Sequence, residues 1–155
     1  MTQTNTKAVD AAAVHAALNL QLANWSVLYA KLHQFHWLVK GPHFFTLHAK
    51  FEELYREAAA RVDELAERVL ATGGRPLSTM REFLAAATLQ EGSGDESAIE
   101  MVRSVASDYR TLAQELGQAI ADAEGAGDDA TADLLLGIRE SIEKHAWMLD
   151  AFASA

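Results

Sequence analysis

Long stretches of chain without glycine or proline constrain the fold more than any other feature of this sequence. Between its few breakers, apolar residues recur every three or four positions, as they do on amphipathic helices and not on strands. This spacing predicts long helices at about 11–40, 44–71, 97–123 and from about 129 nearly to the C-terminus, with a short helix at about 80–89. Such a set is typical of an all-α four-helix bundle.

Two links between these helices differ in length. Gly41-Pro42 permits only a tight turn, because proline cannot extend a helix and disfavours helical geometry in the residue before it. The link at 72–96 is long enough for a crossover between the second and third long helices. Within it, Thr79 and Glu82 have the spacing of a capping box, which predicts the start of the short extra helix.

The composition excludes several classes of protein. The absence of cysteine excludes disulfides, thiol catalysis and cysteine-bound metal clusters, so His, Asp and Glu must hold any metal. The formal net charge of −9 repels DNA and acidic membranes but attracts cations. No apolar run approaches the roughly 18 residues of a membrane span, and no signal peptide is evident, so we expect a cytoplasmic location. The length suits one domain at 11–155, preceded by a flexible tail at 1–10.

Histidines and acidic residues around the first turn are candidate metal ligands. His36 and His48 flank the turn. Glu52 follows His48 by four residues, and Asp63 and Glu67 are also four apart, so each pair shares one helical face. Taken singly, a histidine on an apolar stripe is more often a core residue, and a charged pair is more often part of a solvated face. Together, two histidines and three carboxylates make a ligand set suited to iron.

The distance along the second helix separates these candidates into two groups. His48 and Asp63 lie about 22 Å apart on a straight helix that rises about 1.5 Å per residue. One helix therefore cannot bring both groups to one ion. A second copy packed antiparallel across a two-fold axis near residues 57–58 would place its Asp63 and Glu67 beside the first group, giving two shared sites per dimer. The small residues at 58–60 would permit close approach.

Much of the chain carries recognisable motifs, namely HQFHW at 33–37, KGP at 40–42, FFTLH at 44–48, FEELY at 51–55, DELAER at 63–68, GGRP at 73–76 and KHAWM at 144–148. With these motifs the chain resembles the Dps family of miniferritins from about residue 16 to residue 152. That family is known for a ferroxidase centre between two subunits, whereas ordinary ferritins assemble theirs inside one bundle. The resemblance thus implies the shared site that the spacing indicates independently.

The resemblance also implies a fold, an activity and an assembly. It implies a ferritin-like bundle and a dodecamer built from two-fold dimers, which oxidises Fe(II), preferably with hydrogen peroxide over oxygen, and stores ferric mineral against oxidative damage. The family pattern places His36, His48 and Glu52 on one subunit and Asp63 and Glu67 on the other. Glu52 stands where many relatives have Asp, and its longer arm affects the second iron position. Zinc is an alternative occupant of the resting site.

Several further residues have expected roles near the site or in the core. Trp37, beside His36, would quench radicals as an aromatic residue does in the family, or fill the dimer interface. Glu53 and Glu57 would face inward and nucleate mineral. Among the remaining candidates, we expect His33 to be solvated. Packing roles are expected for Trp25, His145 and Trp147.

Acidic residues also surround the turn at 125–127. At the start of the last helix, Asp128 and Asp129 are suited to cap free amides. The family, however, has an acidic three-fold pore for iron at this turn. On that resemblance the pore candidates are Glu124, Asp129 and Asp133.

Two other functions compete with iron storage. As an alternative, the chain would be a nucleoid protein that mainly binds and compacts DNA, but residues 1–10 carry one lysine, Lys7, where DNA-binding relatives typically carry a basic arm. A bundle that performs oxygenase chemistry at its metal site is the third interpretation, although helices packed at an interface leave little space for an organic substrate.

Overall fold

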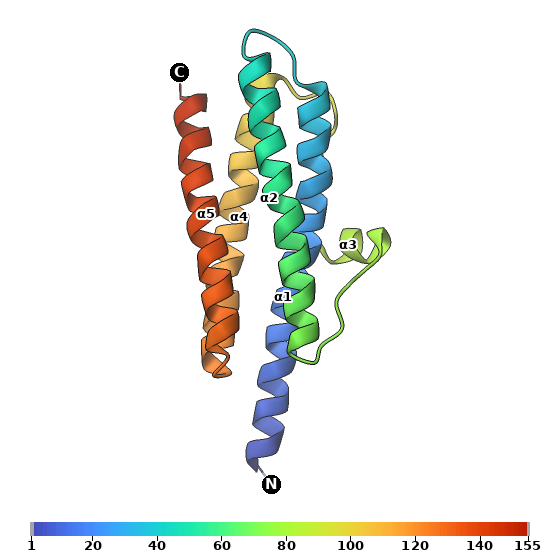
Figure 1. Ribbon diagram of the computed structural model, residues 1–155, viewed down its shortest axis with the longest axis vertical. Helices are drawn as coiled ribbons and strands as arrows, with labels where there is room; N and C mark the ends of the chain where they lie inside the picture. The colour runs from blue at the N-terminus through green and yellow to red at the C-terminus, as the bar shows by residue number, and fades with distance from the viewer. Residues whose placement is uncertain (1, 155) are drawn as a thin grey trace.

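The structure is a computed structural model that describes residues 2–154, with side chains from residue 10 onward. This part of the chain contains five helices. The four long helices are α1 (Thr2–Leu38), α2 (Phe44–Ala71), α4 (Ala98–Gly125) and α5 (Asp129–Ala153), and α3 (Met80–Ala86) is short. The long helices lie side by side, and the link that carries α3 runs along the outside of α1 (Figure 1). The predicted all-α bundle with an extra crossover helix is confirmed.

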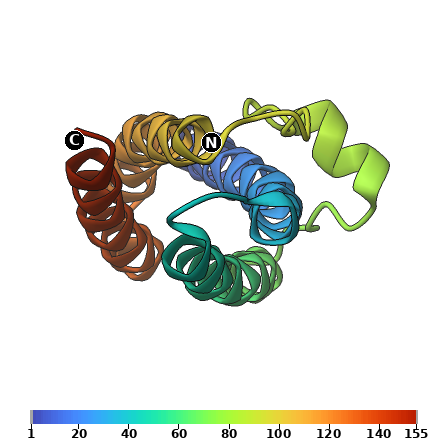
Figure 2. The same cartoon turned by 90° about the horizontal axis from the view of Figure 1, so that it is seen from above.

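The connections set the helix directions. Gly41 has a φ of +104°, a value that glycine adopts without strain, and the tight turn that it makes returns α2 antiparallel to α1. The crossover spans the length of the bundle, so α4 runs in the same direction as α2, and α5 then returns beside α4 (Figures 1 and 2). Helix α1 packs against α2 and α4, and α4 packs against α5.

The helix boundaries follow their breakers and caps. Helix α2 has the predicted bounds. Thr79 forms the predicted capping box with Glu82, and Ser97 forms a second one with Glu100 that we had not predicted. Asp128 caps α5 by accepting a hydrogen bond from the amide of Thr131.

Two predicted boundaries were wrong. Helix α1 begins at Thr2 and not near residue 11. No glycine or proline precedes Gly41, and nothing in the sequence therefore stops the helix from extending towards the N-terminus. Helix α3 ends at Ala86 and not near 89, because Ala87 adopts an extended conformation.

The core is apolar and continuous along the bundle. Trp25 and Phe35 are fully buried on α1, and the packing role expected for Trp25 is confirmed. One ion pair lies within this core: Lys31 Nζ is 2.7 Å from Asp108 Oδ2, and both residues are buried. Within residues 2–154, no helix is long and apolar enough to cross a membrane.

Candidate metal centre

His36, near the end of α1, and His48, in the first turns of α2, face each other across the tight turn. The Nδ1 of each ring donates to the backbone carbonyl of the other residue, at 2.7 Å in both directions. The rings stack with centroids 3.7 Å apart and planes 16° apart. A carbonyl oxygen only accepts, so each Nδ1 carries a proton, and in a neutral ring this leaves the lone pair of Nε2 for a metal.

Glu52 lies one helical turn beyond His48 and is held by two donors. Its Oε1 accepts from Tyr55 Oη at 3.2 Å and from Arg56 Nη2 at 3.1 Å. These hydrogen bonds, first that from Tyr55 and then that from Arg56, lower the pKa of the Glu52 carboxyl, so it is ionised and available to a cation.

Asp63 and Glu67 lie on the far half of α2, away from the histidines. Both are exposed, and neither forms a hydrogen bond or ion pair with any side chain among residues 10–154. Within the same residues, no group of three His, Asp or Glu side chains could hold a metal ion. The five predicted ligands therefore lie at two places on one chain.

The candidate ligands on α2 nevertheless share one surface. Residues spaced by three or four positions form a stripe along the helix that faces away from the bundle core, and we call it the α2 stripe: His48, Glu52, Arg56, Ala59, Asp63 and Glu67. Its members are half-buried at the histidine end and exposed from Arg56 onward. Ala58, which we expected at a close contact between two copies, is instead fully buried within its own bundle.

Aromatic side chains surround the histidine end of the stripe. His33 was expected to be solvated, but its ring stacks on Tyr55 at a centroid distance of 3.8 Å. The same ring lies 4.5 Å from Tyr29 and 5.2 Å from Trp37. Trp37 is 68% exposed, so in a single chain it covers the surface beside His36 and does not fill a core.

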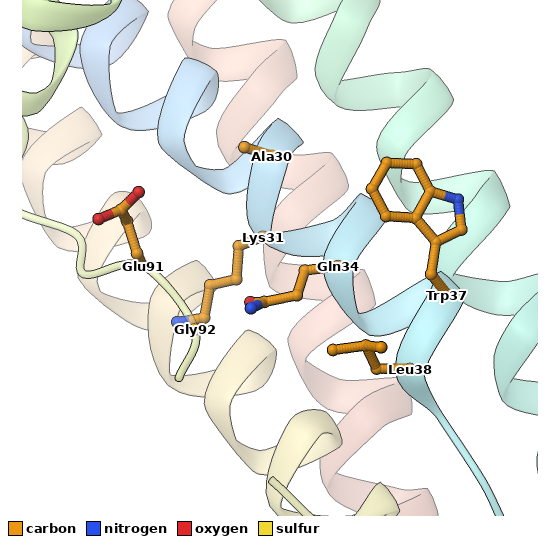
Figure 3. A pocket seen from close by; sticks show the side chains of 7 residues that line it. All are labelled: Ala30, Lys31, Gln34, Trp37, Leu38, Glu91 and Gly92. Atoms are coloured by element: carbon orange, nitrogen blue, oxygen red, sulfur yellow. The ribbon is translucent and has the colours of Figure 1, made fainter. Parts of the chain in front are cut away.

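A hollow beside this cluster contains no metal site. With an approximate volume of 380 Å³, it opens between the end of α1 and the segment at residues 91–92. Lys31 and Gln34 extend towards that segment, and Trp37 projects from another side of the helix (Figure 3). Glu91 carries the one carboxylate among the lining residues. A single carboxylate is too few ligands to hold a metal ion.

Glu57 is half-buried on α2 and is held by three side chains. His145 Nε2 lies 2.6 Å from its Oε2, and Ser141 Oγ and Arg61 Nη2 donate to its Oε1. Burial alone would raise the pKa of Glu57, but the hydrogen bonds from His145 and Ser141 lower it to about 2. Both oxygens of Glu57 thus have partners within the chain, whereas Glu53 is exposed and pairs with Lys50 at 2.7 Å.

His145 and Trp147, both expected to be packing residues, differ in how far they are buried. His145 is half-buried and joins α5 to α2 through Glu57. Trp147 is 67% exposed, so the prediction that it packs within the chain was wrong. The core residues of α5 include Leu135, Ile138, Ile142, Ala146 and Leu149, and Trp147 falls outside their register.

The acidic turn between α4 and α5 separates into two sets. Asp128 pairs with Arg68 at 2.8 Å and accepts from Thr131, so it stabilises the helix end. Glu124, Asp129 and Asp133 are exposed and form no ion pair within residues 10–154. The three pore candidates are thus the carboxylates at this turn that remain free.

Comparisons with known proteins agree with this fold. Residues 15–155 match the Ferritin family model, a ferritin-like domain. The chain is 54% identical over 135 residues to the DNA protection during starvation protein 2 of Bacillus anthracis, which covers 87% of this chain and 92% of that protein.

Solved structures give the same result. A Dps protein from Bacillus brevis superposes with a TM-score of 0.92 and 53% identity, over 93% of this chain and 97% of that one. The Dps protein of Vibrio cholerae O1, described as a member of a broad superfamily of ferritin-like diiron-carboxylate proteins, has a TM-score of 0.90 and 32% identity, over 93% of this chain and 91% of that one.

Proposed function

Because this chain belongs to the Dps family of ferritin-like proteins, we propose that it binds Fe(II) at a site shared by two copies, oxidises it and stores the ferric product. The observation that carries the proposal is the reciprocal pair of hydrogen bonds between His36 and His48. A histidine ligand in a metal site is oriented in this way by a bond from its other ring nitrogen. Both rings are therefore prepared for a metal before it binds.

The stacking of the two rings favours two ions over one. A lone pair of an imidazole nitrogen lies in the plane of its ring, and these two planes are nearly parallel, with centroids 3.7 Å apart. One ion cannot lie in both planes, whereas two ions separated by about 3.5–4 Å, as in dinuclear sites, suit such a pair. His36 and His48 would then each serve a different Fe(II) ion.

A second copy of the chain supplies the missing ligands. His48 with Glu67, and Glu52 with Asp63, share one midpoint along α2, which lies between Glu57 and Ala58. One antiparallel two-fold axis would therefore bring both pairs together at once. Each site would contain His36, His48 and Glu52 of one protomer with Asp63 and Glu67 of its partner.

Two adjacent Fe(II) ions provide the electrons for a two-electron oxidant. Two Fe(II), one hydrogen peroxide and two protons give two Fe(III) and two water molecules, so no hydroxyl radical is released. The relative named for DNA protection during starvation is consistent with such protection. Twelve chains closing into a shell would hold the ferric mineral inside.

Complementation between two inactive variants tests the shared site. Differently tagged His48→Ala and Glu67→Ala chains are co-expressed, and assemblies that contain both chains are purified through both tags. In a mixed dimer one site lacks both ligands and the other has all of them. Since random pairing makes about half of the dimers mixed, about a quarter of the peroxide-dependent Fe(II) oxidation should return. Glu64→Ala, on a neighbouring exposed position of α2 outside the stripe, is the matched control and should keep full activity. Verified mixed dimers without activity would contradict the proposal.

A further inference from the structure

Arg56 is the one cation on the α2 stripe, and it lies between the two acidic groups. One turn before it is Glu52, and beyond it are Asp63 and Glu67. Its Nη2 lies 3.1 Å from Glu52 Oε1, while 72% of its side chain is exposed. A long, exposed arginine keeps many rotamers available, so this ion pair can open without disturbing the core.

Arg56 and Tyr55 both bind the same oxygen of Glu52. Both contacts fall on Oε1, and within residues 10–154 no group donates to Oε2. Glu52 can therefore bind a first cation through Oε2 alone. To bind through both oxygens it must release one or both of these donors, and of the two only Arg56 also carries a charge that repels the incoming ion.

In the shared site that we propose, no charged residue lies directly opposite Arg56. The two-fold register that joins Glu52 to the partner's Asp63 places Ala59 of the partner opposite Arg56. Alanine offers no charge, and within its own chain the guanidinium contacts Glu52. The cation thus stays about one helical turn, or about 6 Å along the axis, from an ion bound by Glu52.

We propose that Arg56 competes with Fe(II) for Glu52, so that the two metal positions of each site fill in sequence, the first tightly and the Glu52 position weakly. This inference rests on the proposed function, because it takes Glu52 as a ligand. Since paired oxidation needs both positions filled, Arg56 would set the Fe(II) concentration at which that reaction begins.

Binding of a redox-inert ion tests this role without relying on activity. Zn²⁺ is titrated calorimetrically into the assembled wild-type protein and into Arg56→Gln, Arg56→Lys and Arg139→Gln variants. Arg139 is the matched control, because it forms an exposed i,i+4 ion pair with Glu143 on α5, outside the stripe. Gel filtration and light scattering confirm equal assembly of all four proteins.

The expected result is specific to charge and to position. Arg56→Gln should tighten the weaker binding step by about tenfold at low salt, leave the tighter step nearly unchanged, and lose this advantage as salt rises. Arg56→Lys should keep the weak step because it keeps the charge, and Arg139→Gln should match wild type. Weaker or unchanged binding in Arg56→Gln, or an equal gain in Arg139→Gln, would overturn the inference.

One further variant separates failure of this inference from failure of the proposed function. If His48→Ala binds Zn²⁺ as wild type does, the shared site is wrong and the role of Arg56 falls with it. If His48→Ala loses binding but Arg56→Gln equals wild type, the shared site stands and Arg56 alone is misassigned.

Discussion

His36 and His48 orient each other: each Nδ1 donates to the other's carbonyl oxygen at 2.7 Å across the turn that joins α1 to α2. Twelve residues of chain separate them, so the pair also closes the helical hairpin. Each ring is aimed by the backbone carbonyl of the other residue, and it also stacks on the other ring, so loss of one ring removes a ligand and the stacking contact that supports its neighbour.

This ring stacking predicts that substitutions at the two histidines are not additive. His36→Ala and His48→Ala should each weaken Co²⁺ binding by about 10- to 100-fold, and the double variant should lose less than the product of the two. The measurement is a Co²⁺ titration followed by visible absorbance. His15→Ala is the control. His15 lies on α1 far along the helix from His36 and contacts Thr72, which follows α2, so this variant should leave Co²⁺ affinity unchanged. Losses that multiply in full would show that the rings are independent.

The sequence predicted helices best where breakers bound them on both sides. Helix α2 lies between Gly41-Pro42 and the glycines at 73–74, and its bounds were predicted correctly. The start of α1 was missed because no residue before Ala11 stops a helix. Caps and breakers mark helix ends, whereas a gradual rise in polarity does not.

Side-chain partnerships were harder to predict than backbone. The spacing rule found His36 and His48, since both flank one turn. It could not find the contact of Glu57 with His145, because those residues are 88 positions apart and meet only through packing of α2 with α5. The stacking of His33 on Tyr55 was missed for the same reason, since it joins two different helices.

The pKa of Glu57 predicts a pH-dependent contribution to stability. That pKa is lowered from 4.5 to about 2 in the folded chain, so the carboxylate stabilises the fold above pH 4.5, and this contribution is lost as the pH falls towards 2. Glu57→Gln should therefore reduce the free energy of unfolding by about 3 kcal/mol at neutral pH, and by less than half as much near pH 3. Urea unfolding at both pH values measures the difference.

The control for Glu57 is a carboxylate with an exposed partner. Glu143 pairs with Arg139 and is 52% exposed, so Glu143→Gln should change the free energy of unfolding by less than about 0.5 kcal/mol. A loss in Glu57→Gln that is equally large in acid would mean that the amide disturbs packing, and that the charge of Glu57 contributes nothing.

Weak binding to DNA is the third expectation, because the chain is acidic and lacks a basic arm. Lys7 is the one basic residue among the first ten, and the net charge is −9 per chain. DNA affinity grows with the number of phosphates neutralised, so the assembled protein should leave DNA unshifted in a gel at moderate salt. The assay includes a chelator, since divalent cations can bridge two acidic surfaces. Retarded protein–DNA complexes that dissociate only at higher salt would favour the nucleoid function instead.

The passage of iron into a shell gives the last prediction. The surface charge of the chain concentrates Fe(II) nearby, but a passage needs carboxylates around a narrow axis. At the turn between α4 and α5, Asp128 is occupied by Arg68 and Thr131, whereas Asp129 and Asp133 are exposed and unpaired within residues 10–154. Their copies could line a three-fold pore together with Glu124.

Asp129→Asn with Asp133→Asn removes two charges per chain, keeps side-chain size, and leaves the proposed iron ligands intact. The double variant should assemble normally and take up iron more slowly, most clearly at low Fe(II), where passage limits the rate. Glu140→Gln with Glu143→Gln removes the same charge from exposed positions elsewhere on α5, and should leave uptake near the wild-type rate. Both variants carry the same net charge, so a slowdown confined to the aspartates identifies a local passage and not a general loss of attraction. Equal rates in wild type and in the aspartate variant at low Fe(II) would make Asp129 and Asp133 ordinary surface charges.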